Sequence, residues 1–289
     1  MFELSATQNQ LQANACEFAK KEIAPRAAEV DRTEQYPWEN VKLLTKQGFM
    51  GMTVPQKYGG PGMSYLDVVL VIEEIAKACG VSARIVVEAN MGAVGAVMKY
   101  GSEVQKKLAA EHVLSGDKPA ICITEPGAGT IALGIAAGAY ELALDYSKQR
   151  EQFGRPICEF QGLQWMLVDM HTQIEAARLL LHKAASSGSG SSGQVAPDVP
   201  GFPDMLEAAQ AKIFSSEMAI KVTNDALQIF GSAGYSRNMP LERMARDARM
   251  FTIGGGTAQI LRTVVASALL NRKLPQTRDG HYKLAAKEA

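Results

Sequence analysis

Two long apolar stripes in the second half of the chain repeat at helical spacing. Their residues recur at steps of three and four, the period that places side chains on one face of an α-helix. The first stripe consists of Phe160, Leu163, Leu167, Met170, Ile174, Ala177 and Leu181. The second consists of Ala209, Ile213, Ser216, Ile220, Thr223 and Leu227. An apolar helix face must be buried against another element, so the two stripes predict a helix bundle.

The segment between the stripes, residues 186–203, is rich in Ser, Gly and Pro. Such a composition buries too little apolar surface to order the chain, and it predicts a flexible loop between two antiparallel helices. Its first part, residues 186–193, has the composition of a designed linker, and a natural insertion accounts for it equally well.

Helical patterns also fill the first third of the chain, separated by strong breaks. Ser5 and Ser102 are each followed three residues later by a glutamine, the spacing of a capping box. Pro55–Gly62 contains three glycines and two prolines and interrupts the helical pattern. The predicted helices begin after Ser5 and Ser64 and span residues 82–99 and 102–114.

One short β-prone run, Ala120–Thr124, lies between the two helical regions. A lone strand leaves its backbone hydrogen-bonding groups unpaired, so it needs a neighbouring strand. Glycine and proline follow it at residues 125–129, and the pattern from Ile131 onward is helical again. The sequence therefore predicts a strand and supplies no partner beside it.

Charge and composition exclude several classes of partner. The 289 residues include 30 basic and 30 acidic side chains, so no global field favours nucleic acid or an anionic membrane. No run of eighteen apolar residues is present, and the N-terminus lacks the basic and then apolar pattern of a signal peptide. We therefore expect no nucleic-acid partner, no membrane span and a cytoplasmic location.

The cysteines and histidines show no metal-site spacing. No CxxC pair occurs, and buried free thiols are expected for Cys16, Cys79, Cys122 and Cys158. Neither a metal-ligand pattern nor a nucleophile motif surrounds His112, His171, His182 and His281. The sequence predicts no metal site.

Several motifs in order along the chain resemble those of the acyl-CoA dehydrogenase superfamily. They are Tyr58-Gly59-Gly60, Ile123-Thr124-Glu125-Pro126-Gly127-Ala128-Gly129, Arg150-Glu151-Gln152-Phe153-Gly154-Arg155-Pro156, Ala226-Leu227-Gln228-Ile229-Phe230-Gly231 and the stretch from Asp247 to Arg262. The resemblance implies FAD bound between the subunits of a homotetramer, an acyl-CoA thioester substrate, and helical domains at both ends with a β-domain between them.

The β-domain implied by this resemblance has no counterpart in the chain. About a hundred residues of strands would follow Gly129 in the family, whereas Thr130 begins the C-terminal helices directly. A true deletion and a sequence that omits residues of a longer protein both account for this. The expected fold is all-α, with an N-terminal helical domain over residues 1–125, a junction at 126–130 and a C-terminal four-helix bundle over 131–289.

Gly255 occupies a position that usually carries the catalytic base of the family. The stretch resembles the family's flavin-binding, substrate-facing loop, in which a glutamate directly precedes the Gly-Thr pair, here Gly256-Thr257. A carboxylate at that position abstracts the α-proton of the acyl thioester, and glycine has no side chain for this task. The loop implies the family's architecture and argues against its usual reaction.

The resemblance also assigns the FAD contacts. Arg150 would offer a bidentate, permanently charged fork to the FAD diphosphate of a neighbouring subunit. The residues implied to bind FAD are Arg150, Phe153, Gln228, Gly231, Ser232, Thr257 and Gln259. Without the resemblance, a solvated arginine, a surface amide and ordinary turn glycines are the better account of these residues, and the order of the combined motifs reverses that preference.

A closer resemblance joins the chain to the 3-sulfinopropanoyl-CoA desulfinases, a group within the same superfamily. These enzymes lack the glutamate, retain FAD and release sulfite from a sulfino-acyl thioester. The similar segments are Tyr100-Gly101-Ser102-Glu103, residues 116–126, residues 160–166, Met250-Phe251-Thr252-Ile253 and residues 274–280.

Arg84 is the residue that this resemblance assigns to the substrate anion. A sulfinate has two acceptor oxygens, which match the geometry of a guanidinium. The alternative is a structural arginine, paired with Glu73, Glu74 or Glu88. The predicted function is FAD-dependent desulfination. The alternatives are an acyl-CoA dehydrogenase with a base supplied elsewhere and a non-catalytic helical assembly module.

Overall fold

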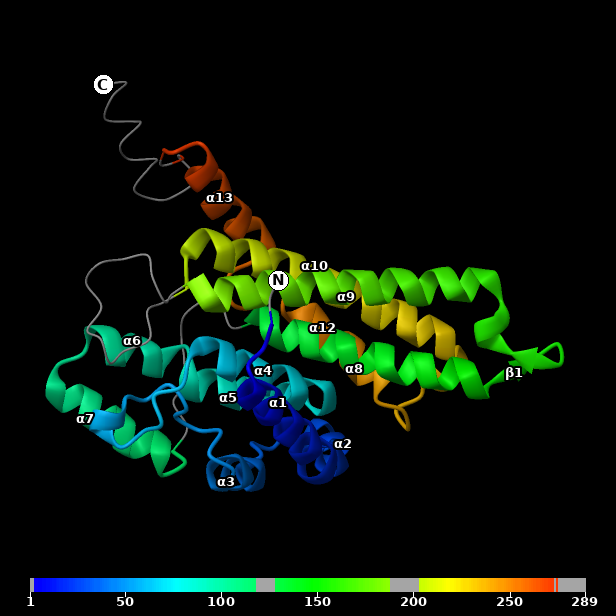
Figure 1. The fold of residues 1–289 in the computed structure, drawn as a ribbon. Coiled ribbons are helices and arrows are strands. Elements are labelled where there is room, and N and C mark those ends of the chain that lie inside the picture. The colour runs from blue at the N-terminus through cyan, green and yellow to red at the C-terminus, as the bar shows by residue number, and fades with distance from the viewer. Residues whose placement is uncertain (1–2, 118–127, 188–202, 273, 275–289) are drawn as a thin grey trace.

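A computed structural model describes residues 3–117, 128–187, 203–272 and 274. Most of these residues are helical, as the sequence predicts (Figure 1). The N-terminal helices are α1 (Ala6–Phe18), α2 (Ala24–Thr33), α3 (Trp38–Lys46), α4 (Tyr65–Ala78), α5 (Gly80–Asn90), α6 (Ala93–Tyr100) and α7 (Glu103–Leu114), with a π-helical turn η1 (Ala19–Ile23) and a 3-10 turn η2 (Gln56–Tyr58). The C-terminal helices are α8 (Ala128–Gln149), α9 (Gln161–Ser187), α10 (Met205–Phe230), α11 (Ser232–Tyr235), α12 (Leu241–Met250) and α13 (Ala258–Leu269).

The predicted helix starts are confirmed by their caps. Complete capping boxes open α1 at Ser5 with Gln8 and α7 at Ser102 with Gln105. A third box opens α4, in which Ser64 pairs with Asp67. In each box a side-chain oxygen accepts a backbone N–H that the first helical turn leaves without a partner.

The π-helical turn η1 lies directly before Pro25, near the start of α2. Proline has no backbone N–H, and its ring clashes with the carbonyl four residues earlier, here that of Lys21. A wider turn at Ala19–Ile23 relieves this clash and lets the chain continue from α1 into α2 without a loop.

The single helix predicted over residues 82–99 is wrong, because α5 and α6 are separated at Met91 and Gly92. Asn90, which is fully buried, causes the break. Its side-chain amide donates to the carbonyls of Phe49 and Val86, both at 2.8 Å, and its own carbonyl accepts the Thr53 hydroxyl at 2.6 Å. The backbone carbonyl of Asn90, which would accept the next helical N–H, is thus engaged by Thr53, while the side chain ties this point of the chain to Phe49.

The stretch Gly80–Tyr100, which covers α5 and α6, is the one segment within the described ranges that is long and apolar enough to cross a membrane. In the folded chain 61% of that window is buried, which fits a core helix.

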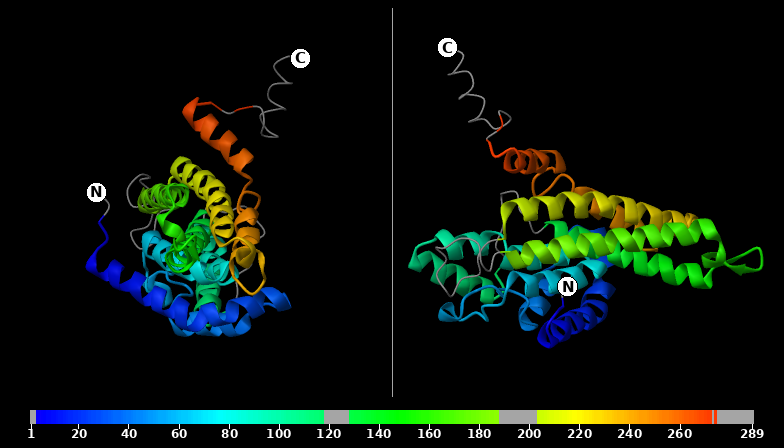
Figure 2. Two further views of the ribbon diagram at one scale, coloured as in Figure 1. Left: turned by 90° about the vertical axis from the view of Figure 1, so that its right-hand side faces the viewer. Right: turned by 45° about the horizontal axis from the view of Figure 1, so that its top comes forward.

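The long helices α8, α9 and α10 run side by side, and α12 packs on α8 and α10 (Figures 1 and 2). The two-residue strands β1 (Glu151–Gln152) and β2 (Arg155–Pro156) pair as an antiparallel hairpin, and a 3-10 turn η3 (Ile157–Glu159) leads into α9. The predicted stripe on α9 is confirmed by its buried members Leu167, Met170, Ile174, Ala177 and Leu181.

The predicted stripe on α10 covers only part of that helix's buried surface. Ala209, Ser216 and Thr223 are buried, whereas Ile213, Ile220 and Leu227 are half-buried. Helix α10 contacts α8, α9, α12 and α13, so several of its faces are covered and a single stripe cannot describe it. This central position also buries Lys212, which a pattern of apolar residues passes over.

The N-terminal and C-terminal helices share one continuous core. Ten residues of α4 are buried, and this helix contacts α1, α5, α8 and α9. The contact with α8 depends on Gly134, because a Cβ at this position would lie 2.4 Å from the carbonyl oxygen of Glu73 and 2.5 Å from the Cβ of Ala76. The two predicted domains therefore meet through closely packed helix backbones.

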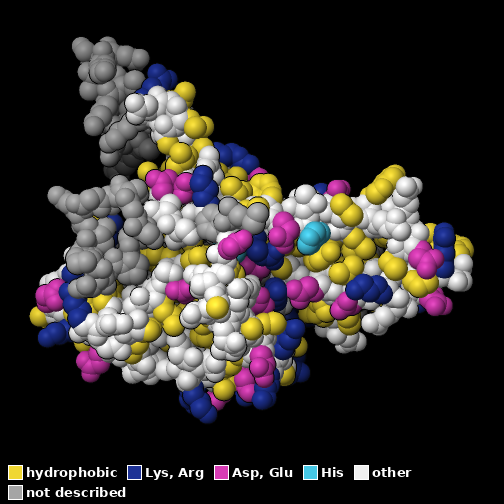
Figure 3. Space-filling view, viewed as in Figure 1, with side chains coloured by type: hydrophobic (Ala, Val, Ile, Leu, Met, Phe, Trp, Pro, Cys, Tyr) yellow, Lys and Arg dark blue, Asp and Glu magenta, His cyan; other side chains and the backbone are white. Residues whose placement is uncertain are grey.

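The predicted domain boundaries at 1–125, 126–130 and 131–289 stay a prediction. The predicted strand Ala120–Thr124 lies outside the described residues, as does all but the ends of the predicted loop 186–203. On the face drawn in Figure 3, positive and negative side chains are interspersed over the described surface.

Candidate functional site

The loop between α12 and α13 contains Gly255 and is closed by its own hydrogen bonds. The backbone N–H of Gly254 donates to the Met250 carbonyl at 2.8 Å, and that of Ala258 donates to the Thr252 carbonyl at 3.0 Å. Thr257 then caps α13, since its hydroxyl oxygen accepts the N–H of Ile260 at 3.1 Å. Residues 252–258 therefore form a short constrained turn.

The backbone at Gly255 explains why glycine suits this position. Gly255 has φ of +70° and Gly256 has φ of +80°, both in the left-handed region. A residue with a Cβ pays about 1–2 kcal/mol for that conformation. A glutamate at position 255 would therefore require a different loop conformation or strain this one. No acidic residue lies between Asp247 and Arg262, so this stretch holds no other carboxylate to act as a base.

Arg84 lies on α5 and is partly committed to a neighbour on the same helix. Its Nε atom is 3.0 Å from Oε1 of Glu88, and the side chains are 30% and 11% exposed. Of the three structural partners that the sequence suggests, the structure selects Glu88, since Glu73 pairs with Arg178 and Glu74 with Lys77. The two terminal nitrogens of Arg84 make no hydrogen bond to another described residue, which leaves both free for an anion.

Asp247 connects the helix before the glycine loop to the helix that carries Arg84. It lies on α12, and its Oδ2 atom is 3.2 Å from where a Cβ on Gly80 would be, at the start of α5. Burial raises the pKa of Asp247 to about 6, against a smaller lowering by Arg243. At neutral pH this carboxylate is therefore charged, and its burial in the charged form lowers the free energy of unfolding.

Asp247→Asn is expected to raise the free energy of unfolding at pH 7 by up to about 3 kcal/mol. The folded pKa of about 6 exceeds the ordinary value of 3.8, so the folded state binds the proton more tightly. The stability that protonation contributes is complete below about pH 4 and is lost as the pH rises toward 6. Urea unfolding at several pH values measures the difference between variant and wild type. Asp145→Asn, at an exposed aspartate of α8, is the control, and a difference independent of pH would refute the assignment.

The residues assigned to FAD form two groups at opposite ends of the bundle. Arg150 follows α8, and Phe153 lies at the hairpin tip with 92% of its side chain exposed. Gln228, Gly231 and Ser232 lie at the same end, where the ring of Phe230 stacks on that of Tyr146 at 4.0 Å. Figure 1 shows the hairpin at one end and α13 at the other.

Thr257 and Gln259 form the second group, at the start of α13 beside Gly255. Helix α10 passes both groups and gives the distance between them. Lys212 of α10 contacts the Gly256 carbonyl next to the second group, and Phe230 of α10 lies next to the first group. Eighteen residues of helix separate these positions, which corresponds to about 27 Å at 1.5 Å per residue. One chain therefore does not bring the two groups together.

The cysteines and histidines of the described residues lie apart from one another. No group of three or more His, Cys, Asp and Glu side chains there could hold a metal ion. Cys16, Cys79 and Cys158 are free thiols as predicted, but only Cys79 is buried, whereas Cys16 and Cys158 are half-buried. Cys122 lies outside the described residues. His112 is engaged with Asp117, with Nδ1 and Oδ2 2.6 Å apart.

Comparison with known proteins follows the same two-part division. A family model described as the acyl-CoA dehydrogenase N-terminal domain matches residues 5–117, and one described as the C-terminal domain matches residues 126–270. Two solved structures show the same fold. Butyryl-CoA dehydrogenase from Megasphaera elsdenii has a TM-score of 0.83 and 24% identity, covering 93% of this chain and 100% of that chain. A glutaryl-coenzyme A dehydrogenase in complex with glutaryl-CoA has a TM-score of 0.83 and 23% identity, covering 94% of this chain and 97% of that chain.

Curated relatives are more similar in sequence. The 3-sulfinopropanoyl-CoA desulfinase of Paraburkholderia xenovorans is 46% identical over 397 aligned positions, covering 96% of this chain and 100% of the relative. That of Variovorax paradoxus is 43% identical, covering 99% and 100%. An alignment of 397 positions is longer than the 289 residues of the chain, so the Paraburkholderia protein has residues with no counterpart here. The chain belongs to the acyl-CoA dehydrogenase family.

Proposed function

We propose that the chain is an FAD-dependent desulfinase that releases sulfite from 3-sulfinopropanoyl-CoA. The observation that carries the proposal is Gly255, which stands in a left-handed turn where a carboxylate base would be needed for α-proton abstraction. The relatives that carry the name 3-sulfinopropanoyl-CoA desulfinase, at 46% and 43% identity, support the same chemistry.

The reaction cleaves the bond between C3 and sulfur. One water supplies the oxygen that turns the sulfino group into sulfite and the proton that C3 receives, so the products are propanoyl-CoA and sulfite. No net electrons leave the substrate, and no external acceptor is consumed. An acyl-CoA dehydrogenase, in contrast, must pass two electrons to an acceptor.

The residues present fit FAD when two copies of the chain are considered. Arg150 can hold a phosphate in a bidentate manner, and Gly231, with φ of +59°, allows close approach of a ligand to the backbone. Thr257 and Gln259 lie about 27 Å away along α10, so a second copy must bring its Arg150 end to this loop. When bound, the flavin would supply a ring system that can accept or donate electrons.

Within this site the chain's own residues bind and orient the substrate. The two free terminal nitrogens of Arg84 would hold the sulfinate oxygens, while Glu88 fixes the guanidinium through Nε at 3.0 Å. The backbone N–H groups of Gly255 and Gly256 make no hydrogen bond to other described residues, and they can donate to the thioester carbonyl. Together these contacts would align the C3 to sulfur bond.

The test of the proposal combines the flavin spectrum with two product assays. The purified chain is reconstituted with FAD, checked for a flavin absorbance, and incubated with 3-sulfinopropanoyl-CoA. We expect sulfite release without reduction of an electron-acceptor dye. Dye reduction would support the dehydrogenase alternative, and a colourless chain that cannot take up FAD would support a non-catalytic helical module.

Arg84→Lys is expected to lower sulfite release by about 10- to 100-fold, because lysine cannot form the bidentate pair with a sulfinate. Unfolding stability should change by less than about 1 kcal/mol, since the Arg84–Glu88 pair is partly solvated. Steady-state kinetics and urea unfolding measure both effects. Arg32→Lys, on an exposed turn of α2, is the control. Turnover close to wild type in Arg84→Lys would remove Arg84 from the site.

The two-copy arrangement also predicts assembly. We propose a homotetramer, in which the exposed hairpin tip at Phe153 contacts a neighbouring copy. Light scattering of the FAD-loaded chain tests this, and a monomer that binds FAD tightly would contradict it.

A further inference from the structure

We infer that Lys212 is a positioning residue that holds the glycine loop in its active conformation from inside the bundle. Its Nζ atom donates a hydrogen bond to the carbonyl of Gly256, the residue that follows Gly255. The contact joins α10 to a loop more than forty residues further along the chain.

The site around Lys212 is closed. The whole side chain is inaccessible to solvent, and it is among the largest of the fully buried side chains in the described part of the structure. On the next turn of α10, Ser215 is also fully buried and its hydroxyl has no hydrogen-bond partner among described residues. Lys212 therefore cannot bind a ligand directly, and its observed contact is the loop carbonyl.

The charge of Lys212 has little compensation nearby. Burial lowers the pKa of Lys212 to about 8, and the nearest acid that raises it is Glu217. Glu217 is already engaged, because both of its carboxylate oxygens lie 2.7 Å from terminal nitrogens of Arg262. Burying an ammonium group without a carboxylate partner destabilises the fold. The strong hydrogen bond that the ammonium donates to the Gly256 carbonyl offsets part of this cost.

The loop needs such an anchor because of its own backbone. Gly255 and Gly256 follow each other and both have positive φ. Glycine is the most flexible residue type, so fixing these two residues costs more conformational entropy than fixing any other pair. The backbone hydrogen bonds of the loop close it on itself and on the end of α12, the helix that precedes it in the chain, but none of those in the described residues ties it to α10. Lys212 supplies that attachment at the carbonyl next to Gly255.

Lys212 also meets the start of α8. A Cβ on Gly129 would lie 3.1 Å from the Cα of Lys212, so the first turn of α8 passes directly over this residue. The end of the junction and the glycine loop therefore converge on one side chain. A shift at either is transmitted to the other through a packed contact.

Hydrogen exchange measured by mass spectrometry tests the inference on the full chain. Lys212→Met keeps the length of the side chain and removes the donor. We expect the amides of Gly254 and Ala258 to exchange at least about tenfold faster, because a hydrogen bond from a charged group is lost. Lys212→Gln keeps a donor on a shorter side chain, so its loop amides should exchange at a rate between those of wild type and Lys212→Met. Lys221→Met is the control, since Lys221 is exposed on the same helix and pairs with Asp225.

The result separates positioning from general stabilisation. An apolar side chain in place of a buried charge leaves global stability unchanged or raises it, so the peptides of α9 should exchange as in wild type. Equal loop exchange in Lys212→Met and wild type would overturn the inference, as would a rise spread evenly over all helices. This inference rests on the proposed function in one respect, namely that the loop is part of the active site. Sulfite release by wild type tests that function separately, so either can fail alone.

Discussion

Gly134→Ala is expected to lower the free energy of unfolding by about 3 kcal/mol or more. An alanine in a helix interior normally gains up to about 1 kcal/mol over glycine, so the sign here is set by packing. The added Cβ would lie 2.4 Å from the Glu73 carbonyl oxygen, which belongs to the backbone of α4 and cannot turn aside. Helices α4 and α8 would have to separate.

Gly138, one turn later on α8, makes the same kind of approach. A Cβ there would lie 2.7 Å from the carbonyl oxygen of Lys77 and 2.9 Å from its Cα. The glycine pair thus lets the two helix backbones touch, and Gly134→Ala removes half of the arrangement. Urea unfolding followed by circular dichroism measures the loss. Gly162→Ala is the matched control, because a Cβ at Gly162 in the first turn of α9 meets nothing within 4 Å. A Gly134→Ala variant as stable as wild type would disprove the close packing.

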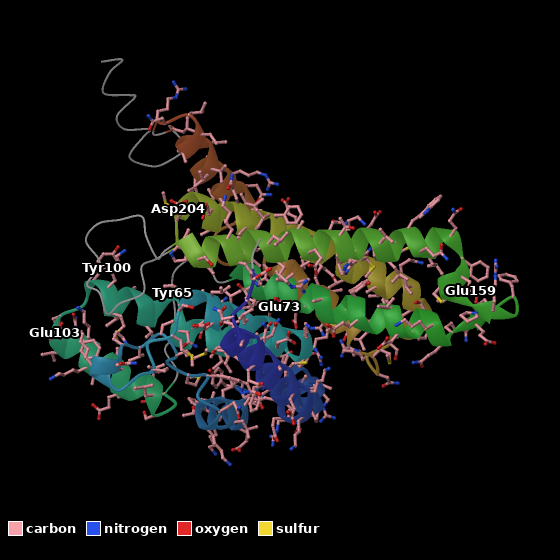
Figure 4. The ribbon with its side chains drawn as sticks, in the orientation of Figure 1. Tyr65, Glu73, Tyr100, Glu103, Glu159 and Asp204 are labelled. Atoms are coloured by element: carbon pink, nitrogen blue, oxygen red, sulfur yellow. The ribbon has the colours of Figure 1, made fainter. Side chains whose placement is uncertain are left out.

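Arg178→Met is expected to cost about 3–5 kcal/mol, because it leaves the carboxylate of Glu73 buried without its counter-charge. Glu73 is fully buried on α4, and Figure 4 shows it where that helix meets the bundle. Arg178 on α9 approaches Oε1 of Glu73 with Nη2 at 2.6 Å and Nε at 2.9 Å. The other oxygen, Oε2, has no hydrogen-bond partner among the described residues, so Arg178 provides the compensation that the structure shows.

The double variant Glu73→Met with Arg178→Met should recover more than half of this loss, since a buried pair replaced by apolar side chains is often neutral. Lys183→Met is the control on the same helix. Lys183 is 61% exposed and lies 3.2 Å from Glu207, and an exposed pair of this kind contributes less than about 1 kcal/mol. Similar losses in Arg178→Met and Lys183→Met would show that burial does not set the energy of the Glu73–Arg178 pair.

The parts of the fold that the sequence predicted are those decided by neighbours along the chain. A capping box needs residues three positions apart, so Ser5 and Ser102 marked their helices correctly. The stripe on α9 was predictable because that helix has one buried side. The same reasoning described α10 incompletely, since helices on several sides bury it and no single period reports that.

The features that the sequence did not reveal depend on contacts between distant segments. Asn90 ends α5 through bonds to Phe49 and Thr53, about forty positions away. Lys212 appeared as one lysine within a helical pattern. A lysine between Ala211 and Ile213 was a weak signal of burial, and only the packing of α8, α10 and the glycine loop turned it into a structural contact.

The sequence proposes the candidate site as a set of residues, which stays a prediction, and it does not give their arrangement. The missing carboxylate at Gly255 is visible in the sequence, and so is Arg84 in an apolar run. The sequence left the pairing of Arg84 open, and the structure resolved it toward Glu88. The separation of the FAD-assigned residues into two distant groups follows only from the direction and length of α10.

The direct contact between α4 and α8 has a consequence for how such genes change. The described helices before residue 118 and after residue 127 pack directly on each other through α4 and α8, so we expect the connection between them to tolerate an insertion. A module can be gained or lost there while the scaffold keeps its internal contacts. For protein engineering, the same connection offers a place to graft a foreign domain without rebuilding the frame formed by α4 and α8.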